Sequence, residues 1–190
     1  MMHGMQNIIS TEAPVIQQLT HEWNGQPVNS PVEYSFTLEG ESLVFRAAQA
    51  AAVSIHPEAV PGKFKEELWM YDTAEFFVAD AEGKNYIEFN LCPNGAWWAC
   101  AFCGPRQPLA GAGVPEGVET TGSVTPAGWG CSARLPLTWL ESLGINIRHC
   151  RLAATCILNS PDYHFCTTSD DQSGEPDFHR PWSWAIAKVQ

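Results

Sequence analysis

The chain has 190 residues, a length at which one domain buries about two-thirds of the surface that its unfolded chain exposes. Its net charge is −11 and its ten Lys and Arg residues are not clustered, so nucleic acid is excluded as a partner, since most of the surface would repel phosphate. No apolar run approaches the roughly 20 residues of a membrane span, and the N-terminus lacks a basic region followed by an apolar one. We therefore expect a soluble, cytoplasmic protein that contacts no membrane.

The expected strands begin in the N-terminal third, after a segment over residues 1–14 that we expect to be loose. Apolar and polar residues alternate over 32–38, and a turn at 39–41 leads to a second strand over 43–52. Between 74 and 102, three aromatic-rich runs are separated by DAEGK and CPNG, whose Gly and Asn residues are typical of hairpin turns. These runs predict a three-stranded antiparallel meander.

The second half of the chain continues this pattern. Residues 104–130 hold a large share of the Gly and Pro, which predicts loops around short strands. Thr138 and Glu141 predict a capping box for one short helical turn, TWLESLG. Further strand-like runs follow at 151–158, near 163–168 and at 182–189. About nine short strands predict an all-β fold, a single β-sandwich of two antiparallel sheets over residues 1–190.

The cysteines indicate reduced thiols. There are seven, an odd number, in a chain without an export signal, so a disulfide framework is not expected. Cys100 and Cys103 form a CxxC pair, but zinc would require a second pair or nearby histidines. Strand alternation also puts the two thiols on opposite faces. We expect neither a metal nor a redox function for this pair.

Aromatic and acidic residues gather in the segment that starts at Leu68. An extended backbone would put Trp69, Tyr71 and Glu75 on one side, because their positions have the same parity. Asp72 is close in sequence but points the other way on such a strand. A pyranose stacks its apolar C–H face on indole and bonds its hydroxyls to carboxylates. The segment therefore predicts a sugar-contacting surface or, with Trp69 in the core, an ordinary strand.

Other polar and aromatic positions extend this candidate site. Asn90 shares one face of its strand with Glu88, the face that sees solvent or ligand. Trp97 and Trp98 point to opposite sides of their strand, so one of them is expected to be exposed, and parity does not tell which. Near the C-terminus, Trp182 is a candidate for a second stacking ring. An edge aromatic that covers the sheet is the alternative for Trp182.

Three segments together resemble a known family. The chain is similar to family 9 carbohydrate-binding modules and their DOMON-like relatives in three segments, which are in chain order LWMYDTAEFFV, YIEFNLCPNGAWW and PDFHRPWSW. The resemblance extends from about Val32 to Lys188. It implies an immunoglobulin-like or jelly-roll β-sandwich. It also implies a non-catalytic site in which two tryptophans clamp a terminal sugar while charged and amide side chains bond its hydroxyls.

By position, the resemblance assigns Trp69 and Trp182 to the clamp rings and Glu75 to the hydroxyl-binding carboxylate. His179 stands where the family has an amide. No position of this sequence matches the binding arginine of the family, and Arg106 is our hypothesis for it. The predicted ligand is a small saccharide, bound without a cofactor or a catalytic residue. The predicted ligand-binding set is Trp69, Asp72, Glu75, Asn90, Trp98, Arg106, His179 and Trp182.

Two cofactors are weighed against this prediction. Haem-binding domains of the same superfamily use a Met with a His or Lys, and the residues here that could ligate iron are Met70, His149, His164 and His179. The loop Ser169–Asp177 offers four carboxylates to calcium, but its spacing matches no defined calcium loop and favours an acidic solvated loop. We expect neither cofactor.

An enzyme is the remaining alternative, besides a protein-interaction scaffold. Asp72, Glu75 and Glu88 could supply the paired carboxylates of a glycosidase. The sequence contains no nucleophile elbow, phosphate loop or HExxH motif. We therefore expect binding rather than catalysis, and the sequence gives no signal of the oligomeric state.

Overall fold

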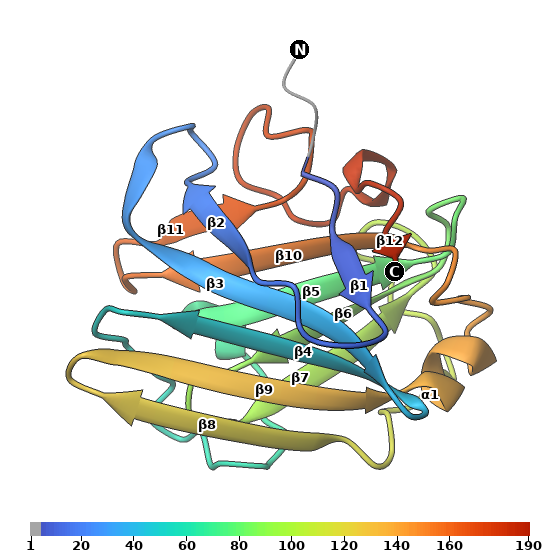
Figure 1. Ribbon diagram of the computed structural model, residues 1–190, viewed down its shortest axis with the longest axis horizontal. Helices are drawn as coiled ribbons and strands as arrows, with labels where there is room; N and C mark the ends of the chain where they lie inside the picture. Colours follow the sequence, from blue (N-terminus) through green and yellow to red (C-terminus); the bar gives the residue numbers. More distant parts are fainter. Residues whose placement is uncertain (1–4) are drawn as a thin grey trace.

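The computed structural model describes residues 5–190, which form two β-sheets stacked face to face (Figure 1). Their strands are β1 (Ile8–Ser10), β2 (Gln17–His21), β3 (Pro27–Glu39), β4 (Ser42–Gln49), β5 (Thr73–Ala79), β6 (Tyr86–Leu91), β7 (Trp97–Phe102), β8 (Glu119–Thr125), β9 (Gly128–Pro136), β10 (Arg151–Leu158), β11 (His164–Thr167) and β12 (Lys188–Val189). One sheet has the order β12-β1-β3-β4-β9-β8, with β2 paired to β3, and the other β11-β10-β5-β6-β7. The predicted all-β sandwich is confirmed.

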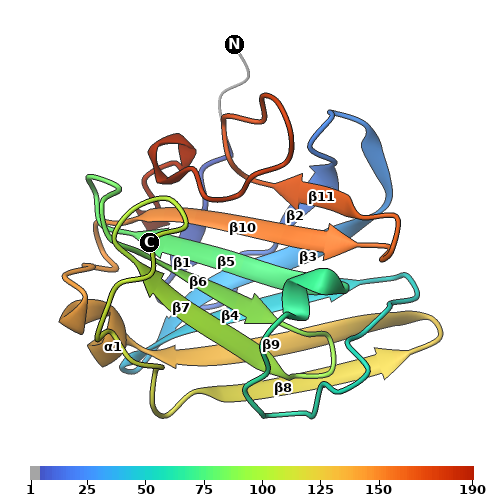
Figure 2. The same cartoon turned by 180° about the vertical axis from the view of Figure 1, so that it is seen from behind.

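The predicted meander is also confirmed, and it positions the site. β5, β6 and β7 pair antiparallel in succession, with Glu75 opposite Asn90 and Phe77 opposite Glu88. Because side chains alternate along a strand and directly paired residues share a face, Glu75, Phe77 and Glu88 emerge on the same side. This side is the outer face of the five-stranded sheet, which faces the viewer in Figure 2.

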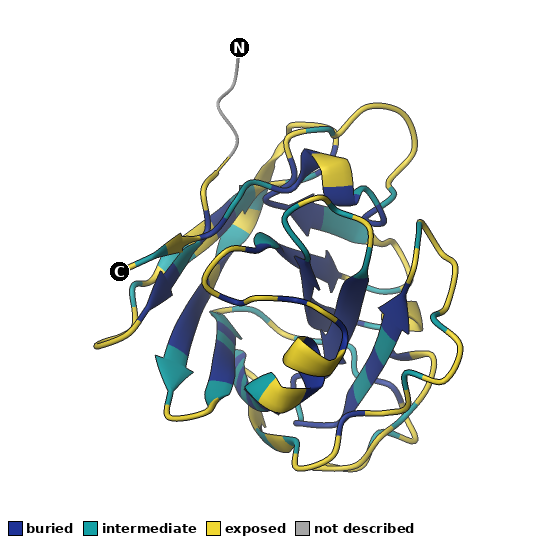
Figure 3. Cartoon of the chain, turned by 90° about the vertical axis from the view of Figure 1, so that its right-hand side faces the viewer, coloured by how far each residue is buried: buried dark blue, intermediate teal, exposed yellow. Residues whose placement is uncertain are grey.

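The main core lies between the two sheets. Phe36 and Phe45 of the first sheet pack on Phe76 of the second, with ring centroids 5.8 and 5.0 Å from that of Phe76, and Phe76 stacks on Phe89 of its own sheet at 5.1 Å. Burial of each such ring stabilises the fold by roughly 1.5 to 3 kcal/mol. Figure 3 shows that buried residues occupy the strands while most exposed residues occupy the loops. Packing of Phe76 inward turns its neighbours Glu75 and Phe77 outward.

A smaller aromatic cluster covers part of that outer face. Phe77 and Tyr86 of the sheet pack against Trp184 of the C-terminal segment, with centroids 5.2 and 5.4 Å from its ring. Phe178 of the same segment packs on Phe77 and, at 6.1 Å, on Trp23. The C-terminal segment therefore forms a partial third layer, beside which the sheet remains accessible.

The N-terminal segment is tied to the first sheet. Residues 1–4 of the predicted loose segment 1–14 lie outside the described residues. Ile8–Ser10 form β1, which pairs in parallel with both β3 and β12, and Ile9 is fully buried. Asn7 donates from Nδ2 to the backbone oxygen of Leu152 at 2.7 Å. The prediction of a loose segment is therefore wrong for the residues around β1.

Two expected strands begin as 3₁₀ turns instead. Leu68–Met70 form η1, after Glu67 in the left-handed region with a φ of 65°, so the strand expected from Leu68 starts only at Thr73. Pro181–Ser183 form η2, with the proline at the start of the turn, where its missing N–H costs nothing. The strand expected over 182–189 is reduced to β12.

The short helical turn is present, but its predicted cap is wrong. Helix α1 (Leu137–Ser142) has Pro136 at its N-cap position and no side-chain capping bond, so Thr138 and Glu141 form no capping box. The strand expected over 43–52 ends at Gln49, and β2 was not expected. Within residues 5–190, no helix combines the length and apolar character of a membrane span.

Candidate functional site

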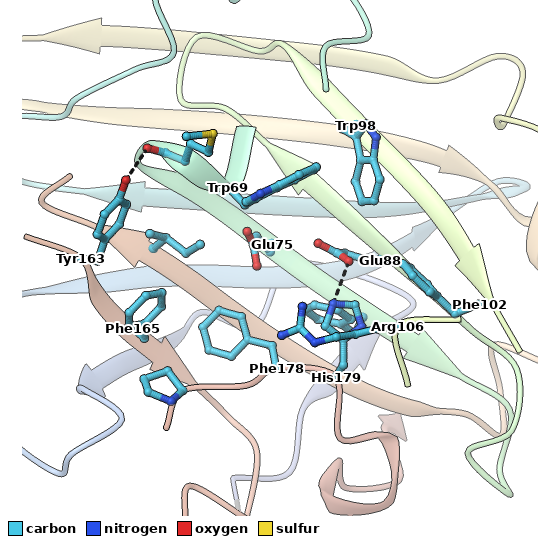
Figure 4. A pocket seen from close by; sticks show the side chains of 14 residues that line it. Trp69, Glu75, Glu88, Trp98, Phe102, Arg106, Tyr163, Phe165, Phe178 and His179 are labelled. Carbon is cyan, nitrogen blue, oxygen red and sulfur yellow. Dashed lines mark hydrogen bonds and ion pairs between the residues drawn. The ribbon is translucent and has the colours of Figure 1, made fainter. Parts of the chain in front are cut away.

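A pocket of about 520 Å³ opens on the outer face of the five-stranded sheet (Figure 4). The sheet provides its floor, η1 provides one wall, and the C-terminal segment with the loop around Arg106 provides the opposite wall. The residues that line it are Trp69, Met70, Glu75, Phe77, Glu88, Trp98, Phe102, Arg106, Ile157, Tyr163, Phe165, Pro176, Phe178 and His179. Aromatic walls over an acidic floor define the character of this site.

Two tryptophans form the first wall. Trp69 of η1 and Trp98 of β7 have ring centroids 5.2 Å apart at an interplanar angle of 69°. Trp69 is 40% exposed, which is high for so large an apolar side chain, and leaves its indole free to contact a ligand. In Figure 4, Glu75 and Glu88 lie between this pair and the opposite wall of Phe178 and His179.

Glu75 is the more deeply buried of the two floor carboxyls, with 1% of its surface exposed. Its Oε2 accepts a hydrogen bond from the Thr155 hydroxyl at 3.2 Å, while Oε1 is buried without a partner. Burial raises the pKa of Glu75 well above its usual value, and the nearby charge of Glu88 raises it further. An unpaired acceptor in this position is available to a donor on a bound molecule.

Glu88 is held by two neutral donors. Oε1 accepts from Nδ2 of Asn90 at 3.0 Å, and Oε2 lies 3.3 Å from Nε2 of His179. Burial raises the pKa of Glu88 to about 7, although the hydrogen bond from Asn90 and the charge of Arg106 lower it. Near neutral pH the floor therefore holds two carboxyls that resist ionising together.

His179 connects Glu88 to a second set of polar groups. Burial lowers the pKa of His179 to about 4, and the charge of Arg106 adds to the effect, so the imidazole is neutral at pH 7. Its Nδ1 lies 2.7 Å from the hydroxyl of Tyr86, which accepts from the backbone N–H of Arg106 at 3.1 Å. All donors are satisfied when Tyr86 donates to Nδ1 and Nε2–H donates to Glu88.

Arg106 is fixed at the rim of the pocket. Its Nη2 donates to Oδ1 of Asp177 at 2.8 Å, and the same oxygen accepts from the backbone N–H of His179 at 3.1 Å. The Arg106 backbone has a φ of 55°, an uncommon conformation that aims its N–H at Tyr86. The guanidinium charge is thus balanced by Asp177 rather than by either floor carboxyl.

The structure brings together five of the predicted residues in this pocket, namely Trp69, Glu75, Trp98, Arg106 and His179. Three others do not line it, namely Asp72, Asn90 and Trp182. The expected extended segment that aligned Trp69 with Glu75 is wrong, because η1 carries Trp69. The two residues meet through folding of η1 over the sheet instead.

Each of the three outlying residues has another place. Asp72 is 3% exposed and accepts from the backbone N–H groups of Ser54 at 3.0 Å and Ser160 at 2.7 Å, so it joins two loops. Asn90 is fully buried and donates from Nδ2 to Glu88. Trp182 lies in η2 and is 59% exposed. Trp98, and not Trp182, is therefore the tryptophan packed beside Trp69.

Sequence reasoning left several lining residues out of the predicted set. Glu88 is one of them, although alternation along β6 had put it on the side of the strand that faces solvent or ligand. Phe165 and Phe178 come from segments whose distance in space from Trp69 no local pattern reveals. Tyr163 reaches the pocket from a turn and donates from its hydroxyl to the backbone oxygen of Met70 at 3.1 Å.

Several of the residues considered for cofactors, namely His164, His179, Asp171 and Asp177, are engaged within the protein. Both ring nitrogens of His179 have partners, and Nδ1 of His164 lies 2.6 Å from Glu22. In the acidic loop, Asp171 pairs with Arg180 at 3.1 Å, and Asp177 pairs with Arg106. The part of the chain that the structure describes contains no cluster of three or more His, Cys, Asp or Glu side chains arranged to hold a metal.

The architecture is that of the family 9 carbohydrate-binding modules, so the resemblance in the sequence is confirmed at the level of the fold. A module of this family from Caldicellulosiruptor kristjanssonii, in complex with cellotriose, superposes with a TM-score of 0.63 and 13% identity over 98% of this chain and 94% of that one. A family 9 module from the same organism, in complex with glucose, superposes with a TM-score of 0.62 and 14% identity over 98% of this chain and 96% of that one.

A candidate carbohydrate-binding protein from Bacteroides uniformis superposes with a TM-score of 0.74 at 12% identity, over 99% of this chain and 100% of that one. No protein-family model matches the sequence. The chain is 25% identical over 178 residues to the UPF0462 protein C4orf33 homolog of Mus musculus, covering 86% of this chain and 85% of the mouse protein. It is 28% identical over 92 residues to the human UPF0462 protein C4orf33, and the match covers 47% of this chain and 46% of the human protein.

Proposed function

We propose that the pocket binds a small saccharide without chemical turnover. The observation that carries this proposal is the exposed Trp69 indole, packed beside Trp98, above two buried carboxyls of which Glu75 has an unpartnered oxygen. A sugar ring matches both features, since its C–H face is apolar and its rim carries hydroxyl donors. The pocket volume of about 520 Å³ lies in the range of small-ligand sites.

The compared structures support the choice of ligand class. The modules from Caldicellulosiruptor kristjanssonii were solved with cellotriose and with glucose, and they share this fold. In this chain, Trp69 would stack on the sugar, Glu75 would accept from a hydroxyl, and Arg106 would donate from the rim. Glu88 is the less free carboxyl, because Asn90 and His179 already bond both of its oxygens.

Calorimetric titration tests the proposal, with ligands chosen from a glycan array. Trp69→Ala should weaken binding by about 10- to 100-fold, which corresponds to roughly 1.4 to 2.8 kcal/mol. Trp182→Ala is the matched control, because it removes an exposed indole of the same size outside the pocket. Equal losses in both variants, or undiminished binding in Trp69→Ala, would reject the assigned site. Failure of every glycan to bind would reject the function.

One observation favours a second candidate, glycoside cleavage. The pKa of Glu88, raised by burial to about 7, suits a general acid, and Glu75 is a second carboxyl in the same pocket. Turnover of aryl glycosides that disappears in Glu75→Gln would establish this activity. Binding without any turnover would leave the non-catalytic proposal standing.

A further inference from the structure

The two floor carboxyls lack a cationic partner. Their hydrogen-bond donors within residues 5–190 are a hydroxyl, an amide and a neutral imidazole, from Thr155, Asn90 and His179 respectively. Buried carboxylates are normally paired with a cation or kept protonated. The two carboxyls, Glu75 on β5 and Glu88 on β6, are diagonal neighbours on adjacent strands. Glu75 is opposite Asn90, and Glu88 is two residues before Asn90 on β6. When these carboxyls ionise, a positively charged group on a bound molecule would stabilise them.

Arg106 is not the cationic partner of the two floor carboxyls. Its guanidinium lines the pocket, but it pairs with Asp177 at 2.8 Å and its side chain is 64% exposed. The charges of Arg106 and Asp177 therefore balance at the rim. If both floor carboxyls ionise, the pocket carries two negative charges with no fixed counter-ion, in a chain whose net charge is already −11. Such a field attracts a cation.

The walls are suited to a cation as well. Indole and phenyl faces attract ammonium groups, most strongly when water is excluded. Trp69 and Trp98 stand on one side of the carboxyls, and Phe178 on the other (Figure 4). A neutral sugar uses such rings for stacking alone, whereas a charged amine gains from both the rings and the carboxyls.

We propose that the saccharide bound by this pocket carries a protonated amine, which sits between Glu75 and Glu88 beside the tryptophan wall. This inference rests on the proposed saccharide function and names its ligand class as an amino sugar. The amine donates to the free Oε1 of Glu75. It replaces the proton that the carboxyl pair otherwise retains, and that proton passes to solvent.

Calorimetry with three sugars and one simple cation tests the inference, using the full chain at low ionic strength and pH 7. The probes are glucose, glucosamine, N-acetylglucosamine and tetramethylammonium. Glucosamine should bind at least tenfold more tightly than glucose. N-acetylglucosamine has the same substituted position without the charge, and it should show no such gain. The amine, and not the bulk at that carbon, would then account for the preference.

A second measurement counts the protons released. At pH 6, glucosamine titrations in two buffers with different ionisation heats should reveal proton release, and glucose titrations should not. The other ionisable groups that line the pocket or interact electrostatically with the two carboxyls are Arg106, His179, Tyr86, Tyr163, Cys100 and Cys156, and Asp177 pairs with Arg106 at the rim. Burial sets the pKa of His179 at about 4 and raises that of Tyr86 to about 12, so neither exchanges protons at pH 6. On this proposal the released protons come from Glu75 and Glu88.

Matched variants locate the effect. Glu75→Gln and Glu88→Gln should each reduce the preference for glucosamine over glucose to below about threefold, while the exposed Glu116→Gln outside the pocket should leave it unchanged. Equal affinity for glucose and glucosamine overturns the inference and leaves the saccharide function standing. Binding of tetramethylammonium is expected from the carboxyls and rings, but if it binds while none of the three sugars does, the inference is overturned, since the proposal requires a saccharide. Absence of binding by all three sugars removes the inference together with the proposed function.

Discussion

Replacing Glu88 with Gln should change how the stability of the fold depends on pH. Burial raises the pKa of Glu88 to about 7 in the folded protein, while the unfolded chain has the ordinary value of 4.5. A carboxyl with a raised folded pKa contributes stability that is complete below 4.5 and is lost as the pH rises through 7. Glu88→Gln has no proton to lose and does not show this decline.

The magnitude follows from the two pKa values. At about 1.4 kcal/mol for each pH unit between them, wild-type protein loses about 3 kcal/mol through Glu88 between pH 4.5 and pH 8. His179 acts in the opposite direction, because its pKa is lowered from 6.5 to about 4 and its contribution is lost as the pH falls. Glu75, whose pKa burial also raises, acts in the same direction as Glu88, so the wild-type curve combines a loss with rising pH from the two carboxyls and a loss with falling pH from His179. The difference between wild type and Glu88→Gln cancels the contribution of His179 and reports Glu88 together with the effect of its charge on Glu75.

Urea unfolding of both proteins at pH 4, 5, 6, 7 and 8 measures this difference. The free energy of unfolding of Glu88→Gln, relative to wild type, should rise by about 3 kcal/mol across the series. Glu116→Gln, at an exposed position, should follow the wild-type curve with a constant offset. A constant difference between wild type and Glu88→Gln would show that Glu88 ionises normally, and would refute the account of the pocket floor.

Three further predictions concern other parts of the fold. Gly122→Ala should destabilise the protein by about 3 kcal/mol or more in urea unfolding, because the new Cβ would lie 2.2 Å from a backbone carbon of Asn94; a loss under 1 kcal/mol contradicts the packing. Asp72→Ala should cost about 1 to 3 kcal/mol by leaving two loop amides without their acceptor, and unchanged stability contradicts this role. A thiol reagent should modify the exposed Cys103 fastest in the native state, whereas rapid modification of the buried Cys150 would contradict its burial.

Sequence patterns predicted the sheets well because they report burial along a strand. Alternation and turn residues identified β5, β6 and β7, and the expected 151–158 matches β10. The same alternation put Glu88 on the ligand-facing side of its strand. The segment β1 has only three residues, too few to show a strand alternation, so it was expected to be loose although Ile9 is buried in the core and its backbone pairs with β3 and β12.

The assembly of the pocket could not be predicted in the same way. Trp69 faces Glu75 because η1 turns back over the sheet after Glu67, and not because the two residues share a strand face. Trp182 carried the same aromatic signal as Trp98, yet η2 holds it outside the pocket. Alternation along the sequence tells on which face of a single strand a side chain lies. Which loops fold over a sheet depends on contacts between segments far apart in the chain.

The most direct test of the saccharide site is an NMR titration that observes the indole N–H signals of the eight tryptophans. Addition of a sugar selected by the glycan array should shift the signals of Trp69 and Trp98, which border the pocket, and leave that of Trp182 in place. Shifts at Trp182 with Trp69 and Trp98 unchanged, or no shift at any indole at saturating sugar, would contradict the assignment of this pocket.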